Sequence, residues 1–243
     1  MFDLSGRVAL VTGGSSGIGR AMASALRSAG ALVILMARRE GPLRESADQI
    51  GAAAVPVDLS DRDDLHRAAD AAAALHGEPD ILVNSAAVNL RPPLAELTPD
   101  VWDATVAANL TAPFLLGQRF GPGMASRGFG RIINLASQQS IRAFGNSGAY
   151  GASKAGLLGL TRSQAEAWSP YGVTCNAVAP GFVLTPMTAP YYDTVADALA
   201  QRTMVKRNGV PEDYAGIAVF LASRASDYVT GQLICVDGGF SAA

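Results

Sequence analysis

The chain has 243 residues, of which 49% are hydrophobic and 16% charged, and its formal net charge at pH 7 is −2. This length suits one large domain or two small ones, with enough apolar material for a sizeable core. No basic cluster is present, so the charge pattern argues against nucleic acid or an anionic membrane as partner. The apolar runs, such as Val8 to Val11, are far shorter than the roughly 18 residues of a membrane span. Residues 1–7 lack the pattern of a secretory signal, so we expect a cytoplasmic protein.

Side chains that commonly bind metals are few. The chain has two histidines, His66 and His76, and two cysteines, Cys175 and Cys235, with no cluster at ligand spacing. We therefore expect no metal site. We expect both cysteines to be small buried side chains within strands. A catalytic proton must then come from a residue other than histidine.

Short apolar runs alternate with Ala-rich amphipathic stretches along the chain. We expect strands at Arg7–Thr12, Ala31–Ala37, Ala53–Asp58, Ile81–Ser85, Gly130–Ala136, Val173–Ala179 and Gln232–Val236. We expect helices at Gly17–Ala29, Gly41–Ile50, Arg62–Leu75, Pro99–Met124, Ala149–Trp168 and Pro211–Ala222. Apolar strands separated by helices are typical of a parallel sheet covered on both faces. The sequence predicts a single-domain, doubly wound α/β fold with a seven-stranded parallel sheet flanked by helices.

One region interrupts this alternation, at residues 182–208. It carries Pro and Thr-Pro turns and the pair Tyr191 and Tyr192, and it lies between a strand and the next helix. In doubly wound sheets, ligands bind beyond the carboxyl ends of the strands. The region is therefore predicted to be a lid over the substrate.

A glycine-rich turn follows the first strand and opens the first helix. Glycines allow a close backbone approach to a pyrophosphate, and the helix N-terminus offers free N–H groups. A plain turn is the alternative, but the strand before and the helix after it favour nucleotide binding. The predicted contacts are Gly13, Ser15, Ser16, Gly17, Ile18 and Gly19.

The end of the second strand bears on the choice of cofactor. An acidic residue there would accept hydrogen bonds from a free ribose 2′-hydroxyl, but the chain has Ala37, Arg38 and Arg39 instead. Guanidinium groups suit a 2′-phosphate. The residues favour NADP(H), with NAD(H) possible, and the alternative is that both arginines begin a solvated loop.

A tyrosine and a lysine form the second constellation. Tyr150 and Lys154 are four residues apart at the head of a predicted helix, so they share one face, and Ser137 ends the strand before it. A nearby ammonium favours the phenolate, so we expect Lys154 to lower the pKa of Tyr150. Tyr150 would then serve as general acid and base, with Ser137 bonding the same substrate oxygen. A surface pair is the alternative.

These motifs together resemble the short-chain dehydrogenase/reductase family over nearly the whole chain. The resemblance implies one NAD(P)-binding Rossmann domain over residues 1–243 and a homotetramer formed through the two long helices and the last strand. It implies that Asn109 acts with Ser137, Tyr150 and Lys154 in catalysis. It also implies that Lys154 bonds the nicotinamide ribose, with further cofactor contacts at Asp58, Leu59, Asn84, Ala86, Pro180, Gly181, Val183 and Thr185. Ala87 departs from the family's usual glycine.

The substrate is less sharply predicted. Polar groups after the strand ends and in the lid suit a hydroxylated acid or carboxylate. The sequence layout is similar to that of gluconate-type sugar-acid dehydrogenases and of 3-oxoacyl carrier-protein reductases. The alternative to an enzyme is a non-catalytic redox sensor that binds the nucleotide. The candidate substrate residues are Asn89, Gln139, Arg142, Met187 and Tyr191, with Gln138 and Tyr192 beside them.

Overall fold

The computed structural model describes residues 1–242, and its centre is a seven-stranded sheet. Every pair of neighbouring strands is parallel, in the order β3-β2-β1-β4-β5-β6-β7. The order reverses beside β1, which makes the sheet doubly wound, as predicted. The strands are β1 (Val8–Thr12), β2 (Leu32–Ala37), β3 (Ala53–Pro56), β4 (Ile81–Asn84), β5 (Gly130–Leu135), β6 (Val173–Pro180) and β7 (Leu233–Val236).

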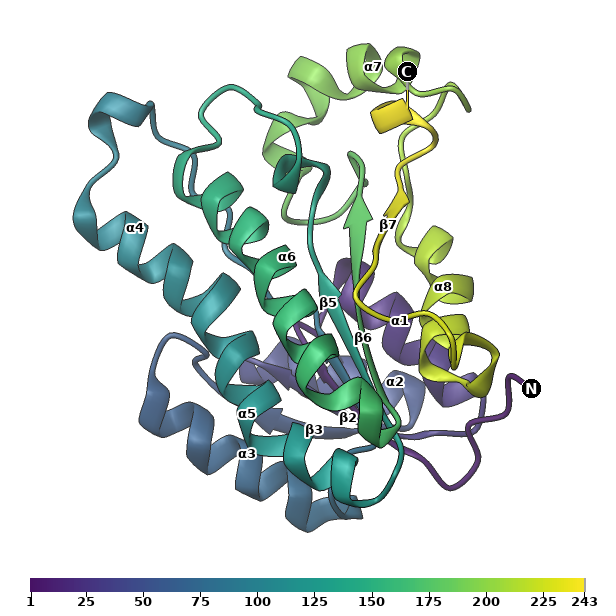
Figure 1. The fold of residues 1–243 in the computed structure, drawn as a ribbon. Helices are drawn as coiled ribbons and strands as arrows, with labels where there is room; N and C mark the ends of the chain where they lie inside the picture. The colour runs from purple at the N-terminus through teal and green to yellow at the C-terminus, as the bar shows by residue number, and fades with distance from the viewer. Residues whose placement is uncertain (243) are drawn as a thin grey trace.

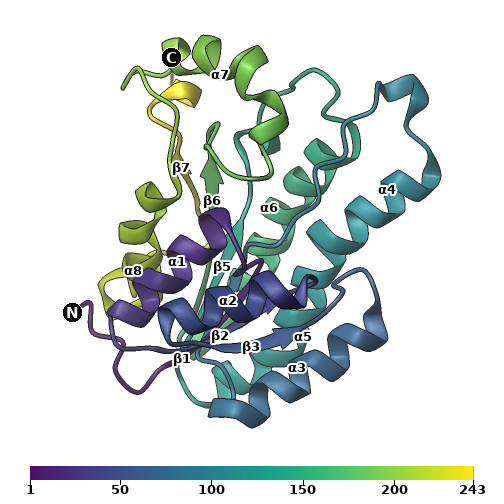
Figure 2. The ribbon, with the colours of Figure 1, turned by 180° about the vertical axis from the view of Figure 1, so that it is seen from behind.

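Helices cover both faces of the sheet (Figures 1 and 2). The apolar side chains of each face pack with those of the helices on it, which is why the strands carry almost continuous apolar runs. One face is covered by α1 (Gly17–Ser28), α2 (Glu40–Ile50) and α8 (Ala215–Ala222). The other is covered by α3 (Arg62–His76), α5 (Ala112–Ser126) and α6 (Gly148–Trp168).

The long helix predicted at Pro99–Met124 is interrupted. It consists of α4 (Pro99–Val106), a π-helical turn at Ala107–Thr111, and α5. Pro113 has no N–H group, so it cannot donate to the carbonyl of Asn109 four residues earlier, and the ladder of hydrogen bonds changes there. Turns of this kind often lie at functional sites. This one places Asn109 inside the protein, with its side chain fully buried.

The lid region contains a helix that the sequence reasoning missed. α7 (Tyr192–Arg202) occupies the middle of residues 182–208 and lies beyond the arrowhead of β6 in Figure 1. Its apolar residues are too few for a strong periodic signal, and only Ala196 is buried. No helix was predicted in this segment, and its role as a substrate lid stays a prediction.

The two cysteines differ in their surroundings. Cys175 on β6 is buried, and burial raises the pKa of its thiol to about 12. Cys235 on β7 is exposed, so the prediction that both are buried was wrong for this residue. β7 is the edge strand, and less of it is covered by helices. Within residues 1–242, no helix is long and apolar enough to cross a membrane, and no group of His, Cys, Asp and Glu has the arrangement of a metal site.

Candidate active site

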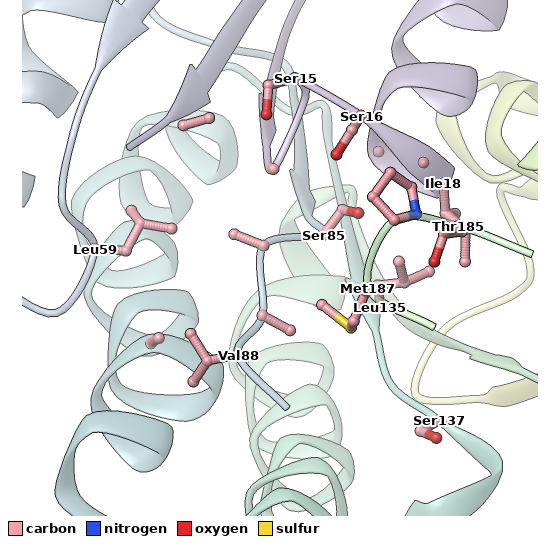
Figure 3. A pocket seen from close by; sticks show the side chains of 18 of the residues that line it. Ser15, Ser16, Ile18, Leu59, Ser85, Val88, Leu135, Ser137, Thr185 and Met187 are labelled. Atoms are coloured by element: carbon pink, nitrogen blue, oxygen red, sulfur yellow. The ribbon is translucent and has the colours of Figure 1, made fainter. Parts of the chain in front are cut away.

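A cavity of about 490 Å³ lies beyond the carboxyl ends of the central strands (Figure 3). It extends from the glycine turn before α1 to the head of α6, and residues 183–188 contribute to its lining. Most of the residues predicted to bind the cofactor or to act in catalysis meet in this one space. These are Gly13, Ser15, Ser16, Gly17, Ile18, Gly19, Arg38, Asp58, Leu59, Ala86, Ser137, Tyr150, Lys154, Pro180, Gly181, Val183 and Thr185.

The glycine turn is shaped by close backbone contacts. Gly13 has a φ of +70°, and a Cβ atom there would lie 2.8 Å from the backbone of Ala86. A Cβ on Gly19 would lie 2.5 Å from the carbonyl oxygen of Gly13. Only glycine fits at these two positions. The turn leads directly into the N-terminus of α1, whose first turn carries no acidic residue, and Ser15 and Ser16 line the cavity beside it (Figure 3). This arrangement suits a bound anion.

At the end of β2, the two arginines take different positions. Arg38 lines the cavity, whereas Arg39 is an exposed residue at the N-cap of α2 and does not line it. Arg38 is therefore the arginine that the cavity geometry supports, and the contact predicted for Arg39 stays a prediction. Asp58 accepts hydrogen bonds from the amide and hydroxyl of Ser60, at 3.0 and 2.6 Å. These two bonds hold the pKa of the Asp58 carboxyl below its usual value, and the bond from the hydroxyl has the larger effect. The charge of Arg38 lowers this pKa by a smaller amount.

The segment after β4 forms the floor of the cavity. The hydroxyl of Thr12 accepts hydrogen bonds from the amides of Ser85 and Ala86, each at 3.1 Å, which fixes this segment against β1. Asn84, a predicted cofactor contact, is not in the lining. It is buried in the sheet, where its amide donates to Asn134 at 2.8 Å. The lining instead includes Ala87, whose methyl group was expected near the cofactor ribose, and Ser85 and Val88, which the sequence reasoning did not name as contacts.

Tyr150 and Lys154 lie on the inner face of α6. Both are buried, with relative exposures of 9% and 2%, and the ammonium of Lys154 is 5.8 Å from the centroid of the Tyr150 ring. Lys154 donates a 2.6 Å hydrogen bond to the carbonyl of Leu135, at the end of β5. Ser137 follows that strand, and its side chain lies close enough to the Tyr150 phenol to lower the pKa of that phenol. The three predicted groups are therefore brought together at one end of the cavity.

The electrostatics of this pair differ from the sequence prediction. Burial raises the pKa of Tyr150 above its ordinary value, more than the side chain of Ser137 and the charge of Arg91 lower it. Burial also lowers the pKa of Lys154 to about 8. The expectation that Lys154 depresses the pKa of Tyr150 was wrong for this state of the protein, because desolvation dominates both groups. Tyr150 is thus a protonated phenol at neutral pH.

Asn109 does not line the cavity, although it lies close to it. Its side-chain oxygen accepts from the amide of Val88 at 2.8 Å, and its nitrogen donates to the carbonyl of Val88 at 2.9 Å. The same nitrogen donates to the hydroxyl of Ser153 at 3.1 Å. The side chain therefore joins the π-helical turn to the cavity floor and to α6.

Of the five candidate substrate residues, only Met187 lines the cavity. Arg142 donates to the carbonyls of Phe240 and Ser241, at 3.4 and 3.1 Å, and so holds the C-terminal segment. Gln139 accepts from the hydroxyl of Ser147 at 2.6 Å. Asn89 and Tyr191 are likewise outside the lining. The substrate-binding role of these four residues therefore stays a prediction.

Apolar residues also line the cavity. They are Leu90, Ala104, Ala108, Pro186 and Met187, of which the sequence reasoning named only Met187. A cation lies nearby: Arg91 donates to the carbonyl of Gly145, and its guanidinium is 5.5 Å from the centroid of the Tyr191 ring. It is also the charged residue that lowers the pKa of Tyr150. The sequence signal for Arg91 was its position at the end of the segment that follows β4.

Comparisons with known proteins agree with this geometry. A family described as enoyl-(acyl carrier protein) reductase matches residues 13–241. Gluconate 5-dehydrogenase of Gluconobacter oxydans is 38% identical over 99% of this chain and 97% of its own length. A 3-oxoacyl-[acyl-carrier-protein] reductase of Thermotoga maritima is 35% identical over 97% and 98%. The chain belongs to the short-chain dehydrogenase/reductase family and is an oxidoreductase of that family.

A solved structure gives the same result for the fold. It is a gluconate 5-dehydrogenase from Burkholderia cenocepacia in complex with NADP and tartrate. It is 37% identical, covers 100% of this chain and 98% of its own chain, and superposes with a TM-score of 0.92. The predicted Rossmann fold and family are therefore confirmed.

Proposed function

We propose that this protein is an NADP(H)-dependent oxidoreductase that interconverts a ketone and a secondary alcohol, with Tyr150 as general acid and base. The observation that carries the proposal is the common cavity. A buried phenol lies beside Ser137 and Lys154 and borders the same space as a glycine turn at a helix N-terminus.

The cavity fits a dinucleotide. The absent Cβ atoms of Gly13 and Gly19 leave room for a close backbone approach, and Ser15 and Ser16 offer hydroxyl donors for the pyrophosphate. Arg38 would pair with a 2′-phosphate, since β2 ends without an acidic residue. Val183 and Thr185 would contact the nicotinamide end, and Lys154 its ribose. When bound, the nicotinamide ring supplies or accepts the hydride.

Tyr150 supplies or removes the proton. During reduction its hydroxyl donates to the forming alkoxide oxygen, and Ser137 donates a second hydrogen bond to that oxygen. Because burial raises the pKa of Tyr150, we expect carbonyl reduction to be favoured near neutral pH. Alcohol oxidation, which needs the phenolate, should accelerate as pH rises toward that pKa, and rate measurements in both directions across pH test this.

The substrate class follows from the lining of the cavity. Apolar side chains at Leu90, Ala104 and Met187 line the cavity, and the cation Arg91 lies close enough to affect the pKa of Tyr150. This combination suits a small hydroxy or keto acid, with Arg91 in the carboxylate-binding role predicted for Arg142. A sugar acid belongs to this class, and the tartrate complex of the related structure supports it. The apolar lining also suits a 3-oxoacyl thioester, which is the second candidate.

A panel of substrates with two arginine variants separates these candidates. Arg91→Ala should raise the KM for carboxylate substrates about tenfold and leave that for neutral ketones within about twofold, because one charge-assisted hydrogen bond is lost. Arg142→Ala is the control, since its side chain contacts the C-terminal segment. Equal effects of Arg91→Ala on both substrates would refute its role, and efficient turnover of a neutral oxoacyl thioester alone would favour the second candidate.

A non-catalytic redox sensor fits the site less well. Such a protein would have no use for the phenol, hydroxyl and ammonium that meet at one end of the cavity. The homotetramer and the cytoplasmic location stay predictions. Sedimentation of the purified protein tests the first.

A further inference from the structure

Two serine hydroxyls outside the proposed chemistry lie between the groups that perform it. Ser153 is 1% exposed on the inner face of α6. Its hydroxyl donates to the carbonyl of Tyr150 at 2.8 Å and accepts from the side chain of Asn109 at 3.1 Å. Asn109 in turn holds the backbone of Val88 in both directions, and Val88 lines the cavity. Ser153 thus links the backbone of the proposed acid to the π-helical turn and, through it, to the cavity floor.

Ser140 makes a corresponding connection on the other side of the site. It lies in the short 3₁₀ turn that follows β5, at Gln138–Ser140. Its hydroxyl donates to the carbonyl of Lys154 at 2.9 Å and accepts from the amide of Ser137 at 3.3 Å. The hydroxyl of Ser137 accepts from the amide of Gln139 at 3.1 Å, which completes a capping box.

The two serines therefore connect three separate segments. Ser137 lies after β5, Asn109 in the π-helical turn, and Tyr150 and Lys154 on α6. Each serine joins α6 to one of the other two segments. Hydrogen bonds between segments that are distant in the sequence hold these segments at a fixed separation.

We propose that Ser140 and Ser153 are positioning residues, which keep the Tyr150 phenol within reach of Ser137 and Lys154. The inference rests on the proposed function, because it concerns the geometry of the same four groups. Neither hydroxyl touches the reacting atoms. A small displacement of the phenol is enough to matter, since an error of about 1 Å in a catalytic group costs up to about 100-fold in rate.

A neighbouring serine provides a matched control. Ser163 lies on the same helix, and its hydroxyl donates to the carbonyl of Gly159 at 3.1 Å. That bond resembles the one from Ser153 to Tyr150, but Ser163 is exposed and lies on the outer surface of α6. Ser163→Ala removes the same kind of helix bond without affecting a connection between segments.

The experiment compares Ser153→Ala, Ser140→Ala and Ser163→Ala in the full chain. We expect the first two to lower kcat about tenfold with each KM within about twofold, and Ser163→Ala to match wild type. A second readout needs no turnover: the ultraviolet titration of tyrosinate, taken as the difference from Tyr150→Phe. In both site variants the pKa of Tyr150 should move upward, because the influence of Ser137 that lowers it becomes weaker.

The outcomes separate the inference from the function that it deepens. Full activity of Tyr150→Phe would overturn the proposed function, and the titration would still decide the positioning role. The inference would be overturned if the pKa of Tyr150 were unchanged in Ser140→Ala and Ser153→Ala. It would also be overturned if their kcat were the same as that of Ser163→Ala. Should Ser153→Ala not fold, Ser153→Cys retains a weak donor of similar size and should give an intermediate shift.

Discussion

Lys154 is expected to cost the protein stability. The ammonium is fully buried, and desolvation lowers its pKa from 10.5 to about 8. The folded state therefore binds fewer protons than the unfolded state between these pH values, so the free energy of unfolding rises with pH across this window. At about 1.4 kcal/mol per pKa unit, the contribution is about 3 kcal/mol. This cost is fully present below about pH 8, where the buried ammonium is charged, and it disappears as pH rises to about 10.5.

The perturbation that tests this is Lys154→Met, which keeps the length and removes the titration. Urea unfolding of both proteins, without cofactor, gives the difference in unfolding free energy at several pH values between 7 and 10.5. The difference should change by about 3 kcal/mol in favour of wild type as pH rises. Taking the difference cancels the other titrating groups. The lost bond to Leu135 adds a constant offset and no slope. A difference independent of pH would refute the reasoning.

Two further predictions concern packing and the cofactor. Gly121→Ala should destabilise the fold by about 1–3 kcal/mol, because the added Cβ would lie 2.5 Å from the Trp168 ring. Gly216 is exposed on a helix, and an added Cβ there would have no atom within 4 Å, so Gly216→Ala should be neutral or stabilising by up to about 1 kcal/mol. Thermal unfolding of the two variants distinguishes these effects. Arg38→Ala should weaken NADPH binding about tenfold and leave NADH unchanged, and Ala37→Asp should reverse the preference. Equal losses for both nucleotides in a binding titration would contradict the assignment.

The fold was predictable because its signals are local and repeated. Apolar runs bounded by turns gave every strand within two residues at each end, and the glycine turn gave the first βα junction. The helix interruption at Ala107–Thr111 was not predicted, although Pro113 carried the signal. α7 was missed because its buried face is narrow and its stability depends on tertiary contacts.

The site residues on helices and at strand ends were predictable from the sequence, whereas those on loops were less so. Tyr150, Lys154 and Ser137 are fixed by a helix and a strand end, and all three line the cavity. Arg142 and Gln139 follow the same strand, but their side chains bond to the C-terminal segment and to Ser147. Loop direction depends on such long-range contacts, which sequence spacing does not encode.

Burial also overrode an electrostatic argument from spacing alone. An i, i+4 pair of tyrosine and lysine suggests mutual stabilisation of charge, as at a surface. Inside this cavity, desolvation disfavours the charged form of both groups. It raises the pKa of Tyr150 and lowers that of Lys154, whereas mutual stabilisation of charge would do the reverse. The degree of burial comes only from the assembled fold.

The role of Tyr150 is tested most directly by Tyr150→Phe, with hydride transfer followed by nicotinamide absorbance at saturating cofactor and substrate. The account predicts that kcat falls at least about 100-fold, since general acid–base catalysis contributes about that much or more. The dissociation constant of the cofactor should stay within about twofold. Turnover at the wild-type rate, with the cofactor bound as tightly as before, would contradict the account.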